Sequence, residues 1–224
     1  IKEVGKVADL ARLVEERRLE GCQGIGHTRW ATHGGVSVDN AHPHCDDCGN
    51  FVLVHNGIIE NYGLLKEGLV REGYTFQSET DTEVLIQLIE FMKRSNGTDL
   101  STAVQLALTQ VVGAYAIAVL DRNNPDQIVA ARKGSPLVVG IGEDEYFLGS
   151  DATPIIEFTN RVTYIGDEEI VTIRRGEALK IRTITNIEKT PRIQKLEMTL
   201  SQLEKGGYPH FMLKEIFEQP HTLS

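Results

Sequence analysis

The sequence is short of several things that other classes of protein need. Its 224 residues contain 23 Lys and Arg against 32 Asp and Glu, which gives a formal net charge of -9. An acidic body repels nucleic acid and anionic membrane surfaces, so we expect neither as a partner. Only three cysteines are present, at positions 22, 45 and 48, and they are too few and too unevenly placed for a disulfide scaffold.

Long apolar runs and a secretory leader are also lacking. No stretch approaches the roughly 20 apolar residues that span a bilayer, and no charged-then-apolar segment opens the chain. The expectation is a soluble, cytoplasmic protein. What is present is ordinary globular material, with 41% apolar and 25% charged residues and no repeat or low-complexity linker.

The order of the hydrophobic patterns predicts an α+β fold. Apolar residues at helical spacing predict helices near the start of the chain, over 62–73, from Ser78 or Thr80 to about 95, and over about 100–111. From Gly113 the pattern changes to short strands separated by turn signals. This order is typical of sheets covered by helices.

We predict a single domain over residues 1–205, with 206–224 as a junction to further sequence. The chain begins with Ile rather than Met and ends within a second helical pattern. We therefore expect it to be part of a longer protein.

HTRWATHG, residues 27–34, fits neither a strand nor a helix. A packed strand needs apolar residues at alternate positions and a helix needs them every three or four, and this run has neither pattern. Instead it combines two histidines, an arginine, the only tryptophan of the chain and two threonines, followed by paired glycines. This composition predicts a loop that holds a polar ligand.

FVLVHNGII, residues 51–59, leaves two alternatives open. An Asn-Gly pair within a β-branched apolar run is a strong signal for a type I′ hairpin turn, and the local sequence favours that interpretation. Alternatively, the Asn56 side-chain amide and the Gly57 backbone N–H form an oxyanion hole. Glycine would then be required because a Cβ would obstruct the substrate.

Asp81 lies in the first turn of a predicted helix, after Thr80, whose spacing to Glu83 is typical of a capping box. The helix dipole favours a carboxylate there in any protein, which is sufficient to explain Asp81 alone. Paired with Arg29, however, it would complement the ammonium and carboxylate of a free amino acid. With an oxyanion hole nearby, the pair indicates an amide- or acyl-transfer site.

HPHCDDC, residues 42–48, carries two cysteines at C-x-x-C spacing with His42 and His44 beside them. A tetrahedral zinc site is one alternative. A strong zinc signal would include a second spaced pair, which the sequence lacks. We therefore expect Cys45 and Cys48 to be free loop cysteines, and we expect no metal or other cofactor.

Six motifs together resemble one known family. HTRWATHG, AHPH, VHNGIIEN, SETDTEV, GSPLVVGIG and YPHFMLKEIFEQP are similar, in order and over nearly the whole chain, to the glutaminase domain of glutamine–fructose-6-phosphate aminotransferases. This type 2 glutamine amidotransferase domain is related to the glutaminase of amidophosphoribosyltransferases. The latter typically has Tyr-Ser-Thr where this chain has the run from Arg29 to Thr32, so the resemblance to the aminotransferases is specific.

The resemblance implies the N-terminal-nucleophile hydrolase fold, a four-layer sandwich of two antiparallel sheets between helix layers, with its first strands missing here. It implies that the domain hydrolyses L-glutamine. The ammonia serves the conversion of fructose 6-phosphate to glucosamine 6-phosphate, for hexosamine biosynthesis, on sugar-phosphate isomerase domains of the same full-length chain. The family also implies a homodimer for the full-length protein.

The resemblance assigns roles to eight residues. Arg29 would hold the α-carboxylate of glutamine and Asp81 its α-ammonium. The loop around them would close over the substrate, and the oxyanion hole would lie on the Asn-Gly pair. The remaining six are Trp30, Thr32 and His33 in the loop, Asn56 and Gly57 in the oxyanion hole, and His42 supporting the pocket from behind.

The chain departs from the family at the nucleophile. In the family this is a cysteine at the mature N-terminus, whose own α-amino group serves as the base. The present chain begins beyond that segment, and Cys22 lies where the family needs no cysteine. We therefore expect the isolated chain to be inactive. Two alternatives are a glutamine-binding or regulatory module without a nucleophile, and a small zinc-stabilised domain built on HPHCDDC.

Overall fold

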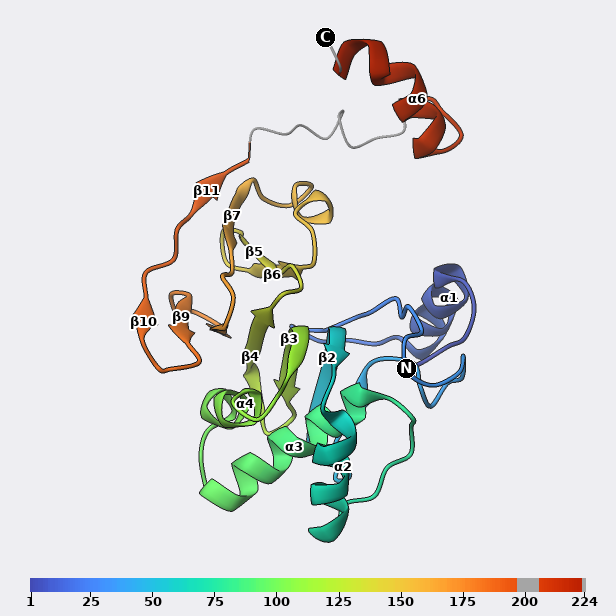
Figure 1. Cartoon of the computed structure of the whole chain (residues 1–224). Coiled ribbons are helices and arrows are strands. Elements are labelled where there is room, and N and C mark those ends of the chain that lie inside the picture. The colour runs from blue at the N-terminus through green and yellow to red at the C-terminus, as the bar shows by residue number, and fades with distance from the viewer. Residues whose placement is uncertain (197–205, 223–224) are drawn as a thin grey trace. The chain divides into compact units, whose positions relative to one another are not determined.

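The computed structural model describes residues 1–196 and 206–222. By its internal contacts the chain divides into two units (Figure 1). The first comprises Ile1–Leu137 and Tyr164–Pro191, and the second comprises Val138–Thr163 and the described residues from Arg192 onward. Within the described part of the chain, no helix is both long and apolar enough to cross a membrane.

A seven-stranded antiparallel sheet forms the body of the first unit (Figure 1). The interior strand β3 is buried over most of its length, which explains the near-continuous apolar run AYAIAVL. The strands, in spatial order, are β1 (His44–Cys45), β2 (Phe51–Ile59), β3 (Gly113–Asp121), β4 (Asn124–Lys133), β8 (Glu169–Arg174), β9 (Lys180–Thr183) and β10 (Glu188–Lys189).

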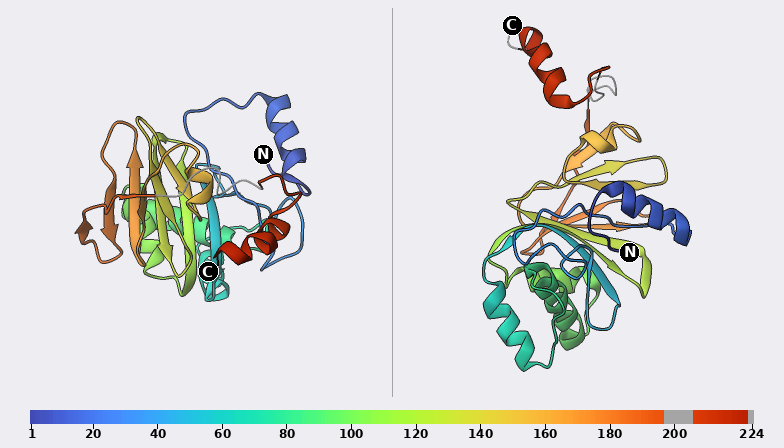
Figure 2. Two further views of the ribbon diagram at one scale, coloured as in Figure 1. Left: turned by 90° about the horizontal axis from the view of Figure 1, so that it is seen from above. Right: turned by 90° about the vertical axis from the view of Figure 1, so that its right-hand side faces the viewer.

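Three helices pack on one face of this sheet and bury the main core: α2 (Tyr62–Arg71), α3 (Asp81–Asn96) and α4 (Leu100–Leu108). Figure 2 shows them gathered on that face. α3 contacts β1 and β2, while α4 contacts β4 and β8. Their limits agree with the predicted helices within a few residues.

The start of α3 is fixed by side-chain capping. Thr80 is the N-cap, and its hydroxyl accepts from the Glu83 backbone N–H at 3.2 Å, as the capping box predicts. The Glu83 carboxylate, however, accepts from the backbone N–H groups of Gln77 and Ser78, at 2.8 and 2.6 Å. The cap therefore holds the chain before α3 as well as the helix itself.

The first predicted helix is also present, as α1 (Val7–Arg17). None of its residues is buried, and its apolar positions Val7 and Val14 are exposed.

The hairpin turn predicted at Asn56-Gly57 is wrong. β2 continues through both residues and pairs with β3 over its whole length, with Asn56 opposite Ala116 and Gly57 opposite Tyr115. The local turn preference of Asn56-Gly57 is overridden by pairing with β3, a strand more than 50 residues further along the chain. Nine ladder pairs with that strand outweigh the preference of two residues for a turn.

The second unit contains a four-stranded sheet with order β11-β7-β5-β6, in which β5 pairs with β6 and β7 with β11 in antiparallel fashion. A small apolar cluster around Val138, Ile155 and Val162 packs within it. Its elements are β5 (Val138–Ile141), β6 (Tyr146–Gly149), the 3₁₀ turn η1 (Thr153–Ile155), β7 (Arg161–Tyr164), β11 (Gln194–Lys195) and the helix α6 (Phe211–Thr222).

Two antiparallel sheets with helices confirm the predicted α+β class. The predicted domain boundary between 205 and 206 falls at the edge of residues 197–205, which lie outside the described residues. It stays a prediction.

Candidate functional site

A cavity of about 120 Å³ lies beside the end of β2 and the N-terminus of α3. Its lining comes from segments far apart in the sequence: the loop from His27 to His33, the β2 region and the first residues of α3. All eight residues singled out from the sequence line this one cavity, namely Arg29, Trp30, Thr32, His33, His42, Asn56, Gly57 and Asp81. Their roles remain predictions.

Asn56 is oriented by a histidine from the loop. The His27 ring Nε2 lies 2.7 Å from the Asn56 Oδ1. With the amide in this orientation, the Nε2–H tautomer of His27 donates and the amide oxygen accepts. The carbonyl end of the side chain is therefore occupied, which leaves its NH₂ group to donate to a ligand.

Gly57 is required by the neighbouring strand. Its φ is +130°, and a Cβ built there would lie 2.1 Å from the Ala114 carbonyl oxygen on β3. We expected a Cβ to obstruct a substrate. The structure shows that it would first collide with β3, so the glycine lets the β2 backbone approach β3 this closely.

Asp81 is 3% exposed, and its carboxylate has two neighbours, the Ile59 backbone and the His33 ring. Its Oδ2 accepts from the Ile59 backbone N–H at 2.8 Å, and its Oδ1 lies 4.0 Å from the His33 Nδ1. The carboxylate thus caps the end of β2 while its other oxygen faces the loop that contains His33.

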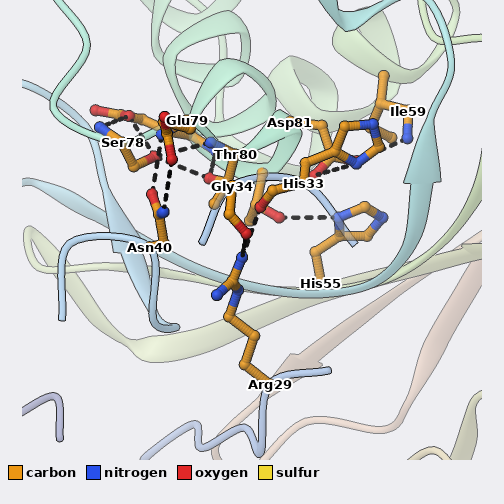
Figure 3. Close-up of polar contacts among 12 residues, drawn as sticks. Arg29, His33, Gly34, Asn40, His55, Ile59, Ser78, Glu79, Thr80 and Asp81 are labelled. Atoms are coloured by element: carbon orange, nitrogen blue, oxygen red, sulfur yellow. Dashed lines mark hydrogen bonds and ion pairs between the residues drawn. The ribbon is translucent and has the colours of Figure 1, made fainter. Parts of the chain in front are cut away.

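Arg29 is held by the backbone of its own loop (Figure 3). Its Nη1 donates to the Gly35 carbonyl at 2.9 Å, and its Nη2 donates to the carbonyls of His33 and Gly34 at 2.6 and 3.2 Å. Three carbonyls therefore fix the plane of the guanidinium. Its other N–H donors are left for a ligand.

The family model for a glutamine amidotransferase domain matches residues 27–157, which is more than half of the chain and contains this cavity. The chain belongs to the glutamine amidotransferase family.

Two curated relatives of this amidotransferase chain carry the same protein name. It is 61% identical over 222 residues to glutamine–fructose-6-phosphate aminotransferase (isomerizing) of Bacteroides thetaiotaomicron, covering 99% of this chain and 36% of that protein. It is 48% identical to the protein of the same name from Chlorobaculum tepidum, covering 100% of this chain and 37% of that protein. The chain thus spans just over a third of the length of these curated relatives.

A solved structure supports the fold. Glutamine phosphoribosylpyrophosphate amidotransferase from B. subtilis, complexed with ADP and GMP, aligns with a TM-score of 0.58 and 28% identity. The alignment covers 72% of this chain and 35% of that one. The amidotransferase chain therefore has the N-terminal-nucleophile type of fold that we predicted.

In the wall of this amidotransferase's cavity, three histidines form a linked group. His55 is 4% exposed, with its Nδ1 3.1 Å from the Thr82 hydroxyl, and its backbone N–H donates to the His42 Nδ1 at 3.3 Å. The His42 ring stacks on His27 with centroids 4.2 Å apart. His42 therefore contacts the ring that orients Asn56 and itself lines the cavity. Its supporting role stays a prediction.

Burial keeps His42 and His44 neutral. It lowers the pKa of His42 to about 2, and that of the buried His44 to about 3. Neighbouring histidines and Arg29 lower the His42 pKa further, because each would repel an added positive charge. A neutral imidazole can accept one hydrogen bond and donate another, which is how the His42 Nδ1 receives the His55 N–H.

Two residues of the predicted closing loop are exposed. Trp30 is 88% exposed and Thr32 is also exposed, although both line the cavity. An exposed tryptophan beside a polar cavity is what a cover needs before it closes over a ligand. The closing movement stays a prediction.

Several residues that build this site were not predicted from the sequence. Thr82 contacts His55, and Asn40 and Glu79 contact the loop that holds Arg29. Glu79 and Thr82 lie within SETDTEV. Their place beside Asp81 in that motif was the one available signal that they belong to the site. Asn40 sits in an ordinary Asp-Asn turn sequence, and only its 4% exposure reveals its importance.

We expect no stoichiometric zinc in this protein. Cys45 and Cys48 are exposed free cysteines, while the His44 Nε2 lies 3.2 Å from the Thr80 hydroxyl. Within the described residues, no group of three or more His, Cys, Asp or Glu side chains is placed to hold a metal. Elemental analysis of protein purified without chelator tests this. One equivalent of zinc that disappears in Cys45→Ser would contradict it.

Acid should destabilise the protein through its neutral histidines. Because the pKa of His44 is lowered to about 3, the unfolded chain takes up a proton below pH 6.5 while the folded chain does not. Stability is therefore full above pH 6.5 and falls as pH drops toward 3, by up to about 1.4 kcal/mol per pH unit for this one group. Urea unfolding at pH 7.5, 6 and 5 measures the slope. His44→Gln should flatten it, and an unchanged slope would contradict this account.

Proposed function

We propose that this chain is the glutaminase half of a glutamine–fructose-6-phosphate aminotransferase. In this proposal the cavity binds L-glutamine and the hydrolysed amide supplies ammonia for making glucosamine 6-phosphate from fructose 6-phosphate. The isomerase chemistry belongs to further domains of a cytoplasmic, homodimeric full-length protein. One observation carries the proposal: three distant segments bring an arginine, an aspartate and an Asn-Gly pair to a single cavity.

Recognition of glutamine uses the two charged residues of the wall. Arg29 is oriented by three loop carbonyls and receives the α-carboxylate through its remaining donors. Asp81 is buried with one oxygen bonded to Ile59, and its other oxygen receives the α-ammonium. Opposite charges at the two ends distinguish a free amino acid from a peptide or a simple amide.

The carboxamide lies at the other end of the cavity, beside Asn56 and Gly57. His27 occupies the Asn56 oxygen, so the NH₂ group is available to a developing oxyanion. The Gly57 backbone N–H is the second donor that we assign. Attack on the carboxamide carbon converts its oxygen to an oxyanion, and these two donors stabilise that charge.

The nucleophile is a cysteine at the mature N-terminus, with its α-amino group as base. This assignment comes from the family. None of the chain's three cysteines is among the residues that line the cavity, and Cys22 lies next to the Arg175 side chain instead. Experiments on hydrolysis therefore use the cysteine-led protein, by which we mean this chain within a gene product whose mature N-terminus is a cysteine.

Arg29→Lys in the cysteine-led protein should severely impair the use of glutamine. An ammonium cannot supply the paired donors of a guanidinium, nor bridge three loop carbonyls in one plane. The loss should be about 2–5 kcal/mol in transition-state binding, read from kcat/KM for ammonia release. Arg12→Lys, at an exposed ion pair on α1, is the matched control. An unchanged kcat/KM in Arg29→Lys would remove Arg29 from the site.

A second function, a glutamine-binding or regulatory module, is favoured by the position of the three cysteines away from the cavity. Calorimetry with L-glutamine and an ammonia assay on the natural gene product separate the two. Binding together with ammonia release supports the glutaminase. Binding without release supports the module.

A further inference from the structure

The loop that holds Arg29 is itself held by two residues outside the cavity, Asn40 and Glu79 (Figure 3). The Asn40 Nδ2 donates to the Gly35 carbonyl at 3.0 Å and to the Glu79 Oε2 at 3.1 Å. The same Oε2 accepts from the Gly35 backbone N–H at 3.3 Å. Both polar groups of Gly35 are therefore tied to this pair, and the Gly35 carbonyl also receives the Arg29 Nη1.

The Asn40 side chain makes three of its four possible hydrogen bonds in these contacts, including both that its NH₂ group can donate. Its amide makes two donor contacts, and its Oδ1 accepts from the Glu79 backbone N–H at 2.9 Å. The residue is 4% exposed, so water does not substitute readily for any of these partners. A buried asparagine satisfied in this way fixes the geometry around it.

Gly34 brings the turn directly onto this pair. Its φ is +75°, and a Cβ added there would lie 2.6 Å from the Asn40 Nδ2 and 2.9 Å from the Glu79 Cβ. Glycine is therefore needed for both its conformation and its small size. The turn from His33 to Gly35, which supplies all three carbonyls for Arg29, has no room to shift toward Asn40 and Glu79.

The pair also links the two charged residues of the cavity. Glu79 lies two residues before Asp81, and its backbone N–H is bonded to Asn40. One side of the pair therefore positions the turn under Arg29, and the other side positions the chain that leads into Asp81. The separation of a guanidinium and a carboxylate selects the length of the molecule bound between them.

We propose that Asn40 and Glu79 are positioning residues for recognition of the amino-acid end of the substrate, which rests on the proposed function of the cavity. They hold the turn from His33 to Gly35, whose carbonyls orient Arg29 toward the substrate carboxylate, and they set its distance from Asp81. A misplaced guanidinium binds the substrate carboxylate poorly in the ground state and the transition state alike. The lost binding energy therefore appears as a higher KM.

Glu79 acts here as a hydrogen-bond acceptor, and its charge is not required. Both groups that donate to its Oε2 are neutral, and no ion pair to it occurs among the described residues. Glu79→Gln keeps an acceptor oxygen at that place and should bind glutamine like the wild type. Glu79→Ala removes the acceptor and leaves the Gly35 N–H and one Asn40 N–H without a partner.

The test measures ammonia release by the cysteine-led protein from L-glutamine and from L-glutamine α-amide, which lacks the carboxylate. For glutamine, Asn40→Ala and Glu79→Ala should raise KM by about ten- to a hundredfold with kcat little changed. For the α-amide, which keeps only the ammonium that Asp81 binds, either variant should lower kcat/KM much less. The preference for glutamine over the α-amide therefore falls.

A double-variant cycle tests whether the two residues act through each other. Asn40→Asp places two carboxylates against each other and should raise KM for glutamine as strongly as Asn40→Ala. In Asn40→Asp/Glu79→Gln the new amide donates to the new carboxylate, so KM should return part of the way. Asp99→Ala removes the N-cap of α4 and is the control for general destabilisation.

Four results would overturn the inference: KM unchanged in both alanine variants, equal losses for the two substrates, Glu79→Gln as impaired as Glu79→Ala, or no recovery in the double variant. In each case a wild type that hydrolyses glutamine leaves the proposed function intact. A wild type that neither binds nor hydrolyses glutamine overturns the proposed function, and this inference with it.

Discussion

Expressed by itself, this 224-residue chain should release no ammonia from glutamine above background. Splitting a carboxamide at neutral pH needs a nucleophile and a base, and an oxyanion hole with binding alone supplies only part of the rate. The chain retains Asn56 and Gly57 beside the cavity, but its three cysteines do not line it. Ammonia is measured over hours at saturating glutamine.

The cysteine-led protein should release ammonia, and the same protein with alanine in place of the leading cysteine should not. That pair of proteins differs in one sulfur atom, so a difference in ammonia release between them is due to the nucleophile. Release by the bare chain, abolished by Cys22→Ala, would show that the nucleophile is elsewhere. Cys22 is exposed and adjoins Arg175, so we expect no effect of Cys22→Ala in the cysteine-led protein.

Asn56→Ala in the cysteine-led protein should lower kcat by about a hundredfold or more, as for other oxyanion donors. KM for glutamine should change little, since the contact forms fully only when the carbonyl oxygen acquires charge. His27→Ala should produce a smaller fall, because it frees the Asn56 oxygen and lets the amide turn away from the substrate. Steady-state kinetics of ammonia release give both constants.

Asn96→Ala is the matched control for Asn56→Ala. Asn96 is exposed at the end of α3, where its side chain donates to the Met92 carbonyl. Its replacement should leave kcat and KM as they are. Equal kcat in wild type and Asn56→Ala would exclude the oxyanion assignment even if glutamine binding persisted.

Local sequence determined most of the regular structure of this protein. Helix α3 begins after Thr80 and ends before Gly97. The N-cap hydroxyl and the left-handed backbone conformation of the glycine act on backbone groups only a few residues away. The apolar run from Ala114 to Leu120 forms strand β3 for a similar reason, because a continuously apolar stretch by itself indicates a buried strand. The motifs around Arg29, Asn56 and Asp81 named residues that line one cavity.

Tertiary structure alone decided three features. Asn56-Gly57 continues a strand because β3 pairs with it, and Gly57 is required by the Ala114 carbonyl on that strand. Burial decided that His42 and His44 stay neutral. Asn40 and Glu79 meet across 39 positions of sequence to hold the turn under Arg29. In each case the deciding partner is distant in the chain, and a local pattern carries no information about which distant backbone or side chain folding will bring beside it.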